Sequence, residues 1–413
     1  MMNILVISYF SPADKITGGF RAASFTKYFP EHGINTTLLT SNEDILNDKE
    51  MIDYYNFTDI EFVRGIRIRS IGYKLKVFSL MEFLKLDTFI FFPDIWRFWN
   101  RRLKKKALKL IKNNAYDAIL VTGPPHSSFY AAYQIARKSN IPLVVDYRDP
   151  LMGNPFLSYP PIIKQIVRGK ERKIVNYAKL VVTVGEEYAE IITNSLGIKN
   201  KKIHVINNGF FDYVSIDKMI KKDSKFVISY FGHFYLMRQT LFEFLIKAIR
   251  EVIKNQNLTP ERIVFQYAGK TSRNTLGRII EKYDMADYFK DLGLLDEKHV
   301  LEEMSRSIIN VVLIPPEATY NIPNKVYDYA FSNSHVLLIG EENCAVHNWF
   351  EKIDQKYTLS QRNLDSIVED LLVLYEKWKD SSLYFGCNED KLQEYNRKNQ
   401  AFKMAELLKR ELK

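Results

Sequence analysis

Short apolar runs recur along the chain and alternate with segments whose apolar residues follow a helical period. In the first half these runs occupy residues 3–10, 35–41, 117–123, 142–148, 180–185 and 202–207. In the second half they occupy residues 225–232, 263–269, 309–315 and 335–340. The runs are rich in Val and Ile and show no polar alternation, which is typical of strands buried on both faces of a parallel sheet. The pattern predicts an α/β fold in which helices connect parallel strands.

The series of apolar runs is interrupted by a polar stretch near residues 209–224 and then starts again. A chain of 413 residues also exceeds one ordinary core and fits two domains. We therefore expect two α/β domains, at residues 1–209 and at residues 210–389. Residues 390–413 have helical periodicity, and we expect them to form a helix that crosses back to the first domain.

The composition, 46% apolar and 26% charged, is that of a globular protein. The first apolar run has no basic segment before it, so it indicates a buried strand rather than a signal peptide. Cys344 and Cys387 cannot form a disulfide framework, which suits a reducing cytoplasm. The formal net charge of +10 favours anionic partners, namely phosphates, nucleic acid or an acidic lipid surface.

The basic residues are concentrated in one segment. Residues 97–112 carry eight basic side chains and no acidic one, directly after the aromatic and apolar stretch 77–99. Charged residues and a proline interrupt that stretch, so it does not meet the requirement for a transmembrane helix. An apolar face beside a basic cluster suits binding to an anionic membrane surface. The alternative is a core-packing helix with a solvated basic face.

Several enzyme classes lack their signatures in this sequence. The GxGxxG pattern of dinucleotide-binding folds does not follow the first predicted strand, and the P-loop pattern GxxxxGK(S/T) does not occur. The zinc-protease and serine-hydrolase motifs are also missing, and the histidines are not clustered at metal-ligand spacing. We therefore expect no metal site and no cofactor.

Two loops of the first half carry candidate chemistry. Gly18 and Gly19 follow the first strand and allow close backbone approach to a ligand at a helix start, although a plain strand-to-helix turn has the same sequence. His126 follows the strand at 117–123 and lies at the carboxyl edge of the sheet, where open α/β sheets bind ligands.

A charged triplet follows the next strand. Asp146, Arg148 and Asp149 lie together at the same expected sheet edge. They can orient a hydroxyl-bearing acceptor, or they can pair among themselves as a structural cluster.

The second half offers a phosphate site. Gly232 ends the strand at 225–232, and Arg238 is expected about one helical turn further on, where a guanidinium suits a diphosphate. Asn324, Lys325 and Asp328 are expected at the N-terminus of another helix, which suits phosphate and ribose, although Asp near a helix start is also ordinary capping.

Taken together, these segments resemble the family 4 retaining glycosyltransferases of the GT-B fold, particularly those that build bacterial surface polysaccharides such as capsule or O-antigen. The resemblance spans nearly the whole chain, and it rests on the order and spacing of degenerate motifs. These are LVISYFSP, TGGFRAASFTKYF, VTGPPHSSF, VVDYRDP, the ERKIVNYAKLVVTVGEEYAE segment, HVINNGF, YFGHFYLMR and IPNKVYDYA. It implies two Rossmann-like domains whose parallel sheets face each other across a cleft, with residues 1–209 as the acceptor domain and residues 210–389 as the nucleotide-sugar domain.

The resemblance also implies residue roles. His126 takes the position of the histidine near the donor sugar, and Arg238 takes that of the basic residue on the diphosphate. The family's two motif glutamates align with Tyr320 and Asp328. Asp328 can still hold ribose, whereas Tyr320 cannot replace a carboxylate that orients sugar hydroxyls, and the nearby Glu317 is an alternative.

The implied reaction is metal-independent front-face displacement from a nucleotide-sugar, with retention of configuration. Its growing negative charge is offset by Arg238, Lys325 and helix N-termini. The expected acceptor is a lipid-linked glycan at the inner face of the plasma membrane. A sugar-nucleotide epimerase and a non-catalytic partner protein of the same fold remain alternatives. Nucleic-acid binding lacks any recognisable motif.

Overall fold

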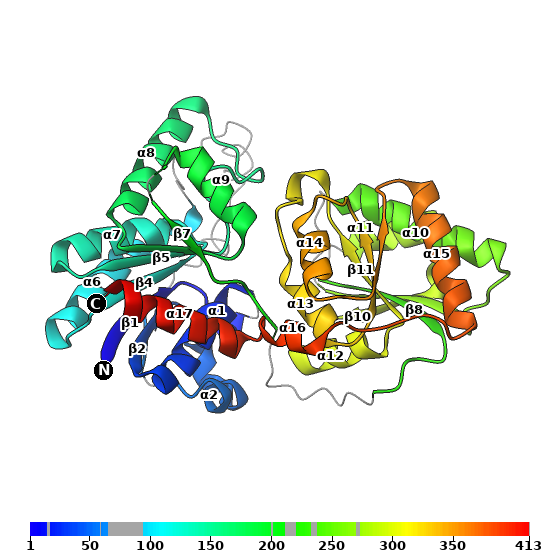
Figure 1. Ribbon diagram of the computed structural model, residues 1–413, viewed down its shortest axis with the longest axis horizontal. Coiled ribbons are helices and arrows are strands. Elements are labelled where there is room, and N and C mark those ends of the chain that lie inside the picture. The colour runs from blue at the N-terminus through cyan, green and yellow to red at the C-terminus, as the bar shows by residue number, and fades with distance from the viewer. Residues whose placement is uncertain are drawn as a thin grey trace. The chain divides into compact units, whose positions relative to one another are not determined.

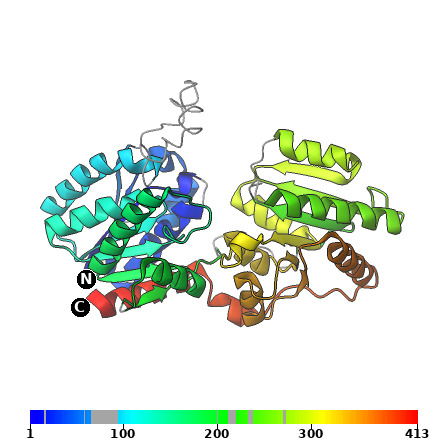
Figure 2. The ribbon, with the colours of Figure 1, turned by 90° about the horizontal axis from the view of Figure 1, so that it is seen from above.

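The computed structural model describes residues 1–14, 17–57, 59–64, 94–199, 201–210, 220–232, 238–269 and 273–412. The chain divides into two compact units. Unit 1 comprises Met1–Asn208 with Arg397–Lys413, and unit 2 comprises Gly209–Asn396. Both units are α/β, with a parallel sheet between layers of helices (Figures 1 and 2). The predicted fold class of two Rossmann-like domains is confirmed.

Unit 1 contains a seven-stranded sheet with the order β3-β2-β1-β4-β5-β6-β7, in which every pair is parallel. Its strands are β1 (Met2–Ser8), β2 (Ile34–Thr40), β3 (Ile60–Phe62), β4 (Ala118–Gly123), β5 (Leu143–Tyr147), β6 (Leu180–Thr183) and β7 (Ile203–Val205). Neighbouring strands end in register, because Ser8 pairs with Thr122 and Thr122 with Asp146. The residues that follow β1, β4 and β5 are therefore neighbours at the carboxyl edge of the sheet.

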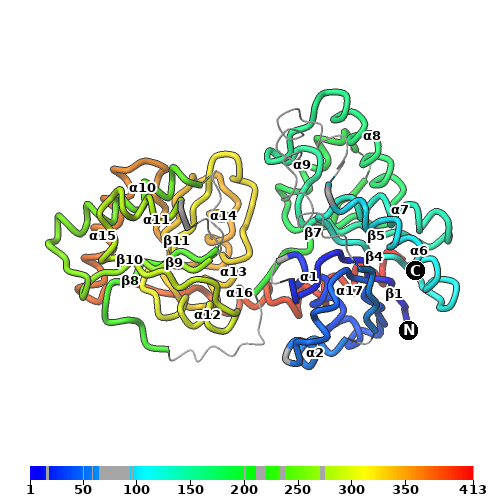
Figure 3. Tube along the Cα trace, turned by 180° about the vertical axis from the view of Figure 1, so that it is seen from behind, coloured from blue at the N-terminus to red at the C-terminus, as the bar shows by residue number. Residues whose placement is uncertain are grey.

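Two helical layers cover the sheet of unit 1. One face packs against α6 (Asn100–Asn113), α7 (Ser127–Ser139), α8 (Pro161–Tyr177) and α9 (Glu186–Leu196). The other face packs against α1 (Thr17–Tyr28) and α17 (Arg397–Leu412), the last helix of the chain, which lies beside α1 (Figure 3). Short elements complete the unit: the 3-10 helices η1 (Pro12–Asp14), η2 (Phe29–His32), η3 (Glu43–Asn47) and η4 (Ile95–Phe98), and α2 (Lys49–Tyr55).

Unit 2 contains a six-stranded parallel sheet with the order β10-β9-β8-β11-β12-β13. Its strands are β8 (Phe226–Phe231), β9 (Ile263–Ala268), β10 (Phe289–Gly293), β11 (Ile309–Leu313), β12 (His335–Ile339) and β13 (Tyr357–Ser360). One face packs against α10 (Gln239–Asn255), α11 (Arg273–Lys282) and α15 (Leu364–Lys379). The other packs against α12 (Glu297–Arg306), α13 (Asn324–Phe331) and α14 (Ala345–Lys352). The unit also contains η6 (Ala286–Tyr288), η7 (Pro316–Ala318) and α16 (Glu389–Gln393).

None of the helices within the described ranges is long and apolar enough to cross a membrane. Of the apolar-aromatic stretch at residues 77–99, residues 77–93 lie outside the described residues. The basic segment that follows forms η4 and α6, and Leu103, Ala107 and Leu110 bury one side of α6 against the sheet of unit 1.

Candidate functional site

In unit 2, two basic side chains converge on one buried tyrosine at the carboxyl end of β8. Arg238 donates from Nη1 to the hydroxyl of Tyr230 over 3.2 Å. The Nζ atom of Lys325 lies 3.6 Å from the centroid of the same ring. Tyr230 itself is 1% exposed, so its ring is a fixed support for both cations. A cation over an aromatic face is attracted by the ring quadrupole, which partly replaces lost hydration.

Each of these two cations lies at the N-terminus of a helix. Arg238 is the residue directly before α10, so it lies at the helix N-cap rather than one turn inside the helix as the sequence suggested. Lys325 is the second residue of α13. Both helix N-termini present unsatisfied backbone N–H groups, and their dipoles favour negative charge nearby. Two cations and two helix starts give this edge the chemistry that suits a phosphate-bearing ligand.

The surroundings of Lys325 suit an anionic ligand. The Nζ atom of Lys325 is buried and has no hydrogen-bond partner among the residues that the structure describes. Burial lowers the pKa of Lys325 well below its ordinary value, and the positive charge of Arg238 lowers it further. A buried ammonium without an anion is unfavourable, and a phosphate oxygen would remove that penalty.

Glycines keep the strand ends next to Lys325 open. Gly232 follows β8 with φ 123°, and its N–H donates to the carbonyl of Ala268 over 2.8 Å. Gly269 follows β9, and a Cβ there would clash with the carbonyl of Gly232. A side chain at either position would therefore be strained or excluded, which leaves bare backbone beside the cations.

Of the other predicted donor residues, Gly18 and Gly19 lie in α1 of unit 1, and those of unit 2 lie around the start of α13. Asn324 is its first residue and is half-buried, and Asp328 lies one turn further along and is also half-buried. Tyr320 lies in the loop between η7 and α13 and is half-buried. Glu317, the alternative carboxylate, is an exposed residue of η7.

In unit 1, His126 is a buried, neutral imidazole at the start of α7. It is 5% exposed, and burial lowers its pKa to about 4. Its Nε2 lies 2.9 Å from the backbone carbonyl of Asp149, so Nε2 carries the proton and donates. The lone pair is therefore on Nδ1, which can accept a hydrogen bond from a hydroxyl group.

One carboxylate that the sequence analysis did not single out holds this region together. Asp94 accepts from the N–H of Trp96 over 3.1 Å with Oδ1 and from the N–H of Ser127 over 2.8 Å with Oδ2. It thereby caps both η4 and α7. Burial raises the pKa of Asp94, and these hydrogen bonds oppose that rise. The residues around His126 and Trp96 consequently share one anchor.

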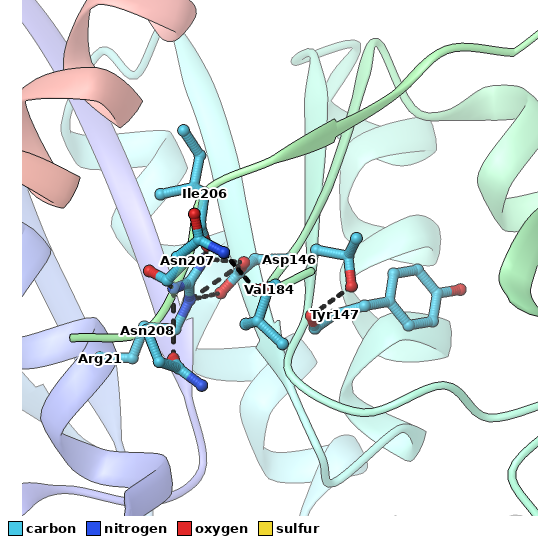
Figure 4. Close-up of polar contacts among 8 residues, drawn as sticks. Arg21, Asp146, Tyr147, Val184, Ile206, Asn207 and Asn208 are labelled. Atoms are coloured by element: carbon cyan, nitrogen blue, oxygen red, sulfur yellow. Dashed lines mark hydrogen bonds and ion pairs between the residues drawn. The ribbon is translucent and has the colours of Figure 1, made fainter. Parts of the chain in front are cut away.

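Asp146 is fully engaged by a residue that the sequence analysis also missed. Arg21, on α1, forms a bidentate pair with Asp146, in which Nε and Nη2 donate over 2.9 and 2.8 Å. The same guanidinium donates to the carbonyls of Ile206 and Asn207, over 2.9 and 3.0 Å (Figure 4). Arg21 is 3% exposed and Asp146 is 0% exposed. The pair therefore ties α1, β5 and the segment after β7 together.

The other members of the charged triplet have different neighbours. Arg148 donates from Nη2 to the carbonyl of Pro124, and burial lowers its pKa to about 10. Burial raises the pKa of Asp149 to about 6, against the opposing effect of Arg148. A Cβ at Gly18 would clash with the Arg148 guanidinium, and one at Gly19 with the carbonyl of Ser11. The glycine pair therefore allows the close packing of α1 on the loops of this edge.

Aromatic side chains flank the same edge. Tyr9 and Phe10 follow β1 and contact Trp96 edge-to-face, with ring centroids 5.9 and 5.8 Å away. All three are half-buried. Partly exposed aromatic rings at the same edge as an imidazole that accepts a hydrogen bond are suited to holding a sugar ring.

Behind His126 lies an acid that is uncharged at neutral pH. Glu171, on α8, is 1% exposed and accepts from the N–H of Met152 over 3.1 Å. Burial raises its pKa from 4.5 to about 8, and the nearby Tyr147 hydroxyl and the Met152 N–H only partly oppose this. The Tyr147 ring lies 6.4 Å from that of His126, measured between centroids. Glu171 thus supports the wall behind the histidine without adding charge.

Replacing Glu171 with glutamine should stabilise the protein in alkaline solution. Between pH 4.5 and about 8 the folded state holds a proton that the unfolded state has released. Unfolding free energy therefore falls as pH rises through that window and is highest below it. Glu171→Gln removes this dependence, so its melting temperature should exceed that of the wild type by several degrees at about pH 8.5 and hardly at all at about pH 5. The exposed Glu190→Gln serves as control, and a difference for Glu171→Gln that did not change with pH would contradict the buried neutral acid.

Among the described residues, no group of three or more His, Cys, Asp or Glu side chains is arranged to hold a metal ion. Cys344 is buried and Cys387 is half-buried, and the two do not form a disulfide with each other.

Comparison with protein families places the N-terminal unit. The family described as Glycosyltransferase Family 4 matches residues 21–210, nearly all of the first segment of unit 1. Most of the N-terminal unit is therefore similar to a glycosyltransferase family 4 domain. Together with the two-unit fold, this match supports a glycosyltransferase of the GT-B type. No curated protein matches the sequence.

Solved structures share the fold of this glycosyltransferase at low sequence identity. A glycosyltransferase from Rickettsia africae ESF-5 superposes with a TM-score of 0.67 and 12% identity, over 100% of this chain and 99% of that one. Sucrose-phosphate synthase from Thermosynechococcus elongatus gives a TM-score of 0.68 and 11% identity, over 99% of both chains. UDP-GlcNAc 2-epimerase from Neisseria meningitidis, solved with UDP-GlcNAc bound, gives 0.59 and 13%, over 99% of this chain and 100% of that one.

Proposed function

We propose that this glycosyltransferase transfers a sugar from a nucleotide-sugar to a lipid-linked glycan, with retention of configuration and without a metal ion. The observation that carries the donor assignment is the convergence of Arg238 and Lys325 on Tyr230 at two helix N-termini. Preorganised cations stabilise charge that grows on a leaving diphosphate, which is the role a metal ion otherwise fills. Gly232 gives the phosphates close access to the backbone, and Asn324 and Asp328 offer partners for ribose.

In this proposal, unit 1 binds the acceptor and supplies His126. A neutral His126 with its lone pair on Nδ1 accepts a hydrogen bond from a sugar hydroxyl without repelling a developing oxocarbenium ion. Arg148 and Asp149 lie at the same edge and are candidates for contact with the acceptor. Asp146 acts through the position of strand β5, because Arg21 occupies both of its oxygens. Gly18 and Gly19 contribute by letting α1 approach this edge.

The lipid-linked acceptor implies work at a membrane. The basic face of α6 and the family's place in surface polysaccharide synthesis, of capsule or O-antigen type, support peripheral attachment to the inner face of the plasma membrane. No cofactor takes part in this scheme, and the nucleotide-sugar is a substrate. No nucleic acid is involved.

A thermal-shift screen tests the donor assignment. UDP, GDP, dTDP, ADP and CMP are compared with their sugar conjugates, first with EDTA and then with magnesium. One nucleotide should raise the melting temperature in EDTA, because a ligand that binds only the folded state stabilises it. The anomeric coupling constant in the product NMR spectrum then reports retention. Stabilisation that appears only with magnesium would overturn metal independence, and no stabilisation by any nucleotide would favour a non-catalytic partner protein.

A second candidate is a sugar-nucleotide epimerase of the same fold, because several solved structures with this fold are UDP-GlcNAc 2-epimerases. An epimerase converts its nucleotide-sugar without any acceptor. Incubation with the stabilising nucleotide-sugar alone distinguishes the two, since a transferase leaves the sugar configuration unchanged apart from slow hydrolysis.

A further inference from the structure

The excess positive charge of the protein resides in one stretch of unit 1. Residues 94–179 contain 17 Lys and Arg against five Asp and Glu, a net charge of +12, whereas the whole chain carries +10. The rest of the chain is therefore slightly acidic. A charge excess confined to one stretch indicates one surface with an anionic partner, rather than a generally basic protein.

This stretch forms the helical layer α6, α7 and α8, in which α6 packs on α7 and α7 packs on α8 (Figure 1). α6 and α7 contain no Asp or Glu, and the single carboxyl group of α8, on Glu171, is 1% exposed. The outer face of the layer consequently carries exposed basic side chains with no acidic one among them. These are Arg101, Arg102, Lys105, Lys109, Lys112, Arg137, Lys138, Lys164, Arg168, Lys170, Arg172 and Lys173.

Large apolar side chains protrude from one end of this cationic layer. Phe156 and Leu157 are 42% and 39% exposed, in the loop before α8. An Asx turn fixes this loop, because the N–H of Phe156 donates to Oδ1 of Asn154 over 2.9 Å. On α8, Ile162 is 74% exposed and Ile166 is 44% exposed.

The apolar and basic residues of α8 share a stripe. Lys170 and Lys173 follow Ile162 and Ile166 at helical spacing, so all four lie along one side of the helix. Aliphatic side chains at one end of a basic stripe are what an interfacial helix presents to a bilayer.

The apolar end of the layer lies at the same edge of the sheet as the proposed acceptor site. α7 and α8 run antiparallel to the strands that they connect, so both begin at the carboxyl edge of the sheet, where His126 precedes α7. The side chains that would enter a bilayer are therefore on the same side of unit 1 as the proposed acceptor site.

We propose that the outer face of α6–α8 docks onto an anionic phospholipid bilayer, with Phe156, Leu157, Ile162 and Ile166 inserted among the lipids and the basic side chains on the head groups. Apolar burial and attraction to anionic head groups add in such a contact. A nucleic acid would contact the basic side chains through its phosphates, but it would make no use of the exposed aliphatic side chains. The inference deepens the proposed transfer to a lipid-linked acceptor and rests on it, because it says how unit 1 reaches such an acceptor.

Vesicle co-sedimentation tests directly whether the outer face of α6–α8 binds a bilayer, and it does not require sugar transfer. Vesicles of phosphatidylcholine with about one third phosphatidylglycerol should retain the full chain at low salt, whereas pure phosphatidylcholine vesicles should not. High salt should weaken binding, because the head-group attraction is screened. Lys170→Glu with Lys173→Glu, and separately Ile162→Glu with Ile166→Glu, should each lower the partition coefficient at least tenfold.

Matched substitutions on unit 2 serve as controls. Lys352→Glu with Lys356→Glu makes the same change of charge on exposed residues, and Val373→Glu places a carboxylate at an apolar position that is 51% exposed. Both controls should sediment like the wild type. Equal retention of every variant, equal retention on neutral vesicles, or release of the protein by tRNA in preference to lipid would each overturn the bilayer assignment. The nucleotide thermal shift is read separately, so a failure here is distinct from a failure of the donor assignment.

Discussion

Arg238→Ala should slow sugar transfer by two to three orders of magnitude while leaving the melting temperature nearly unchanged. The guanidinium is half-buried and donates to the hydroxyl of Tyr230, at the N-cap of α10. Its proposed partner in turnover is the departing diphosphate, and loss of one preorganised electrostatic contact in a transition state typically costs about 10² to 10³ in rate. The rate at saturating donor, together with the affinity for the free nucleoside diphosphate, measures the effect.

Three further variants make the result specific. Arg238→Lys keeps the charge but loses the planar fork, so it should recover part of the rate. Tyr230→Phe keeps the ring under Lys325 and removes only the hydroxyl, so a loss of several-fold is expected. Arg250→Ala, on the same helix and paired with Asp284 at the surface, should transfer at the wild-type rate. Unchanged transfer by Arg238→Ala would remove the diphosphate from this edge.

The central strands could be predicted from the sequence because each is buried on both faces. β4 and β11, for example, have every residue buried and appear as unbroken apolar runs. The strands that the pattern missed, β3, β10 and β13, lie at the edges of the two sheets. They are short and half-exposed, and β10 contains Lys290 and Asp291. An edge strand pairs on one side only, so its sequence need not be apolar.

Site residues could be predicted from the sequence where they directly follow a strand or begin a helix. They could not be predicted where their role depends on contacts between elements far apart in the sequence. Gly232 and Lys325 were found because each follows a strand or begins a helix. Tyr230 was missed, since a tyrosine within an apolar run is indistinguishable from core until its neighbours are known. Arg21 and Asp146 are separated by 125 positions, so nothing local in the sequence links them.

Removal of Arg21 should destabilise unit 1 far more than it changes any ligand contact. Arg21→Met leaves the Asp146 carboxylate buried without its partner, and breaking a buried ion pair in this way costs about 3–5 kcal/mol. For a unit of this size that corresponds to a fall in melting temperature of roughly 10 °C. Hydrogen exchange should localise the damage, with faster exchange in α1 and β5 and unchanged protection in β8 of unit 2.

A double variant separates the ion pair from simple loss of packing. In Arg21→Met with Asp146→Leu no buried charge remains, so most of the lost stability should return, because an apolar pair of similar size is often as stable as a buried ion pair. The carbonyls of Ile206 and Asn207 would still lack their donor, and these residues lie at the point where the chain leaves unit 1. Recovered stability with slow transfer would mean that Arg21 serves the reaction by fixing this exit segment, whereas recovery of both would restrict its role to neutralising Asp146. No recovery of stability would show that the carboxylate is not the cause of the damage.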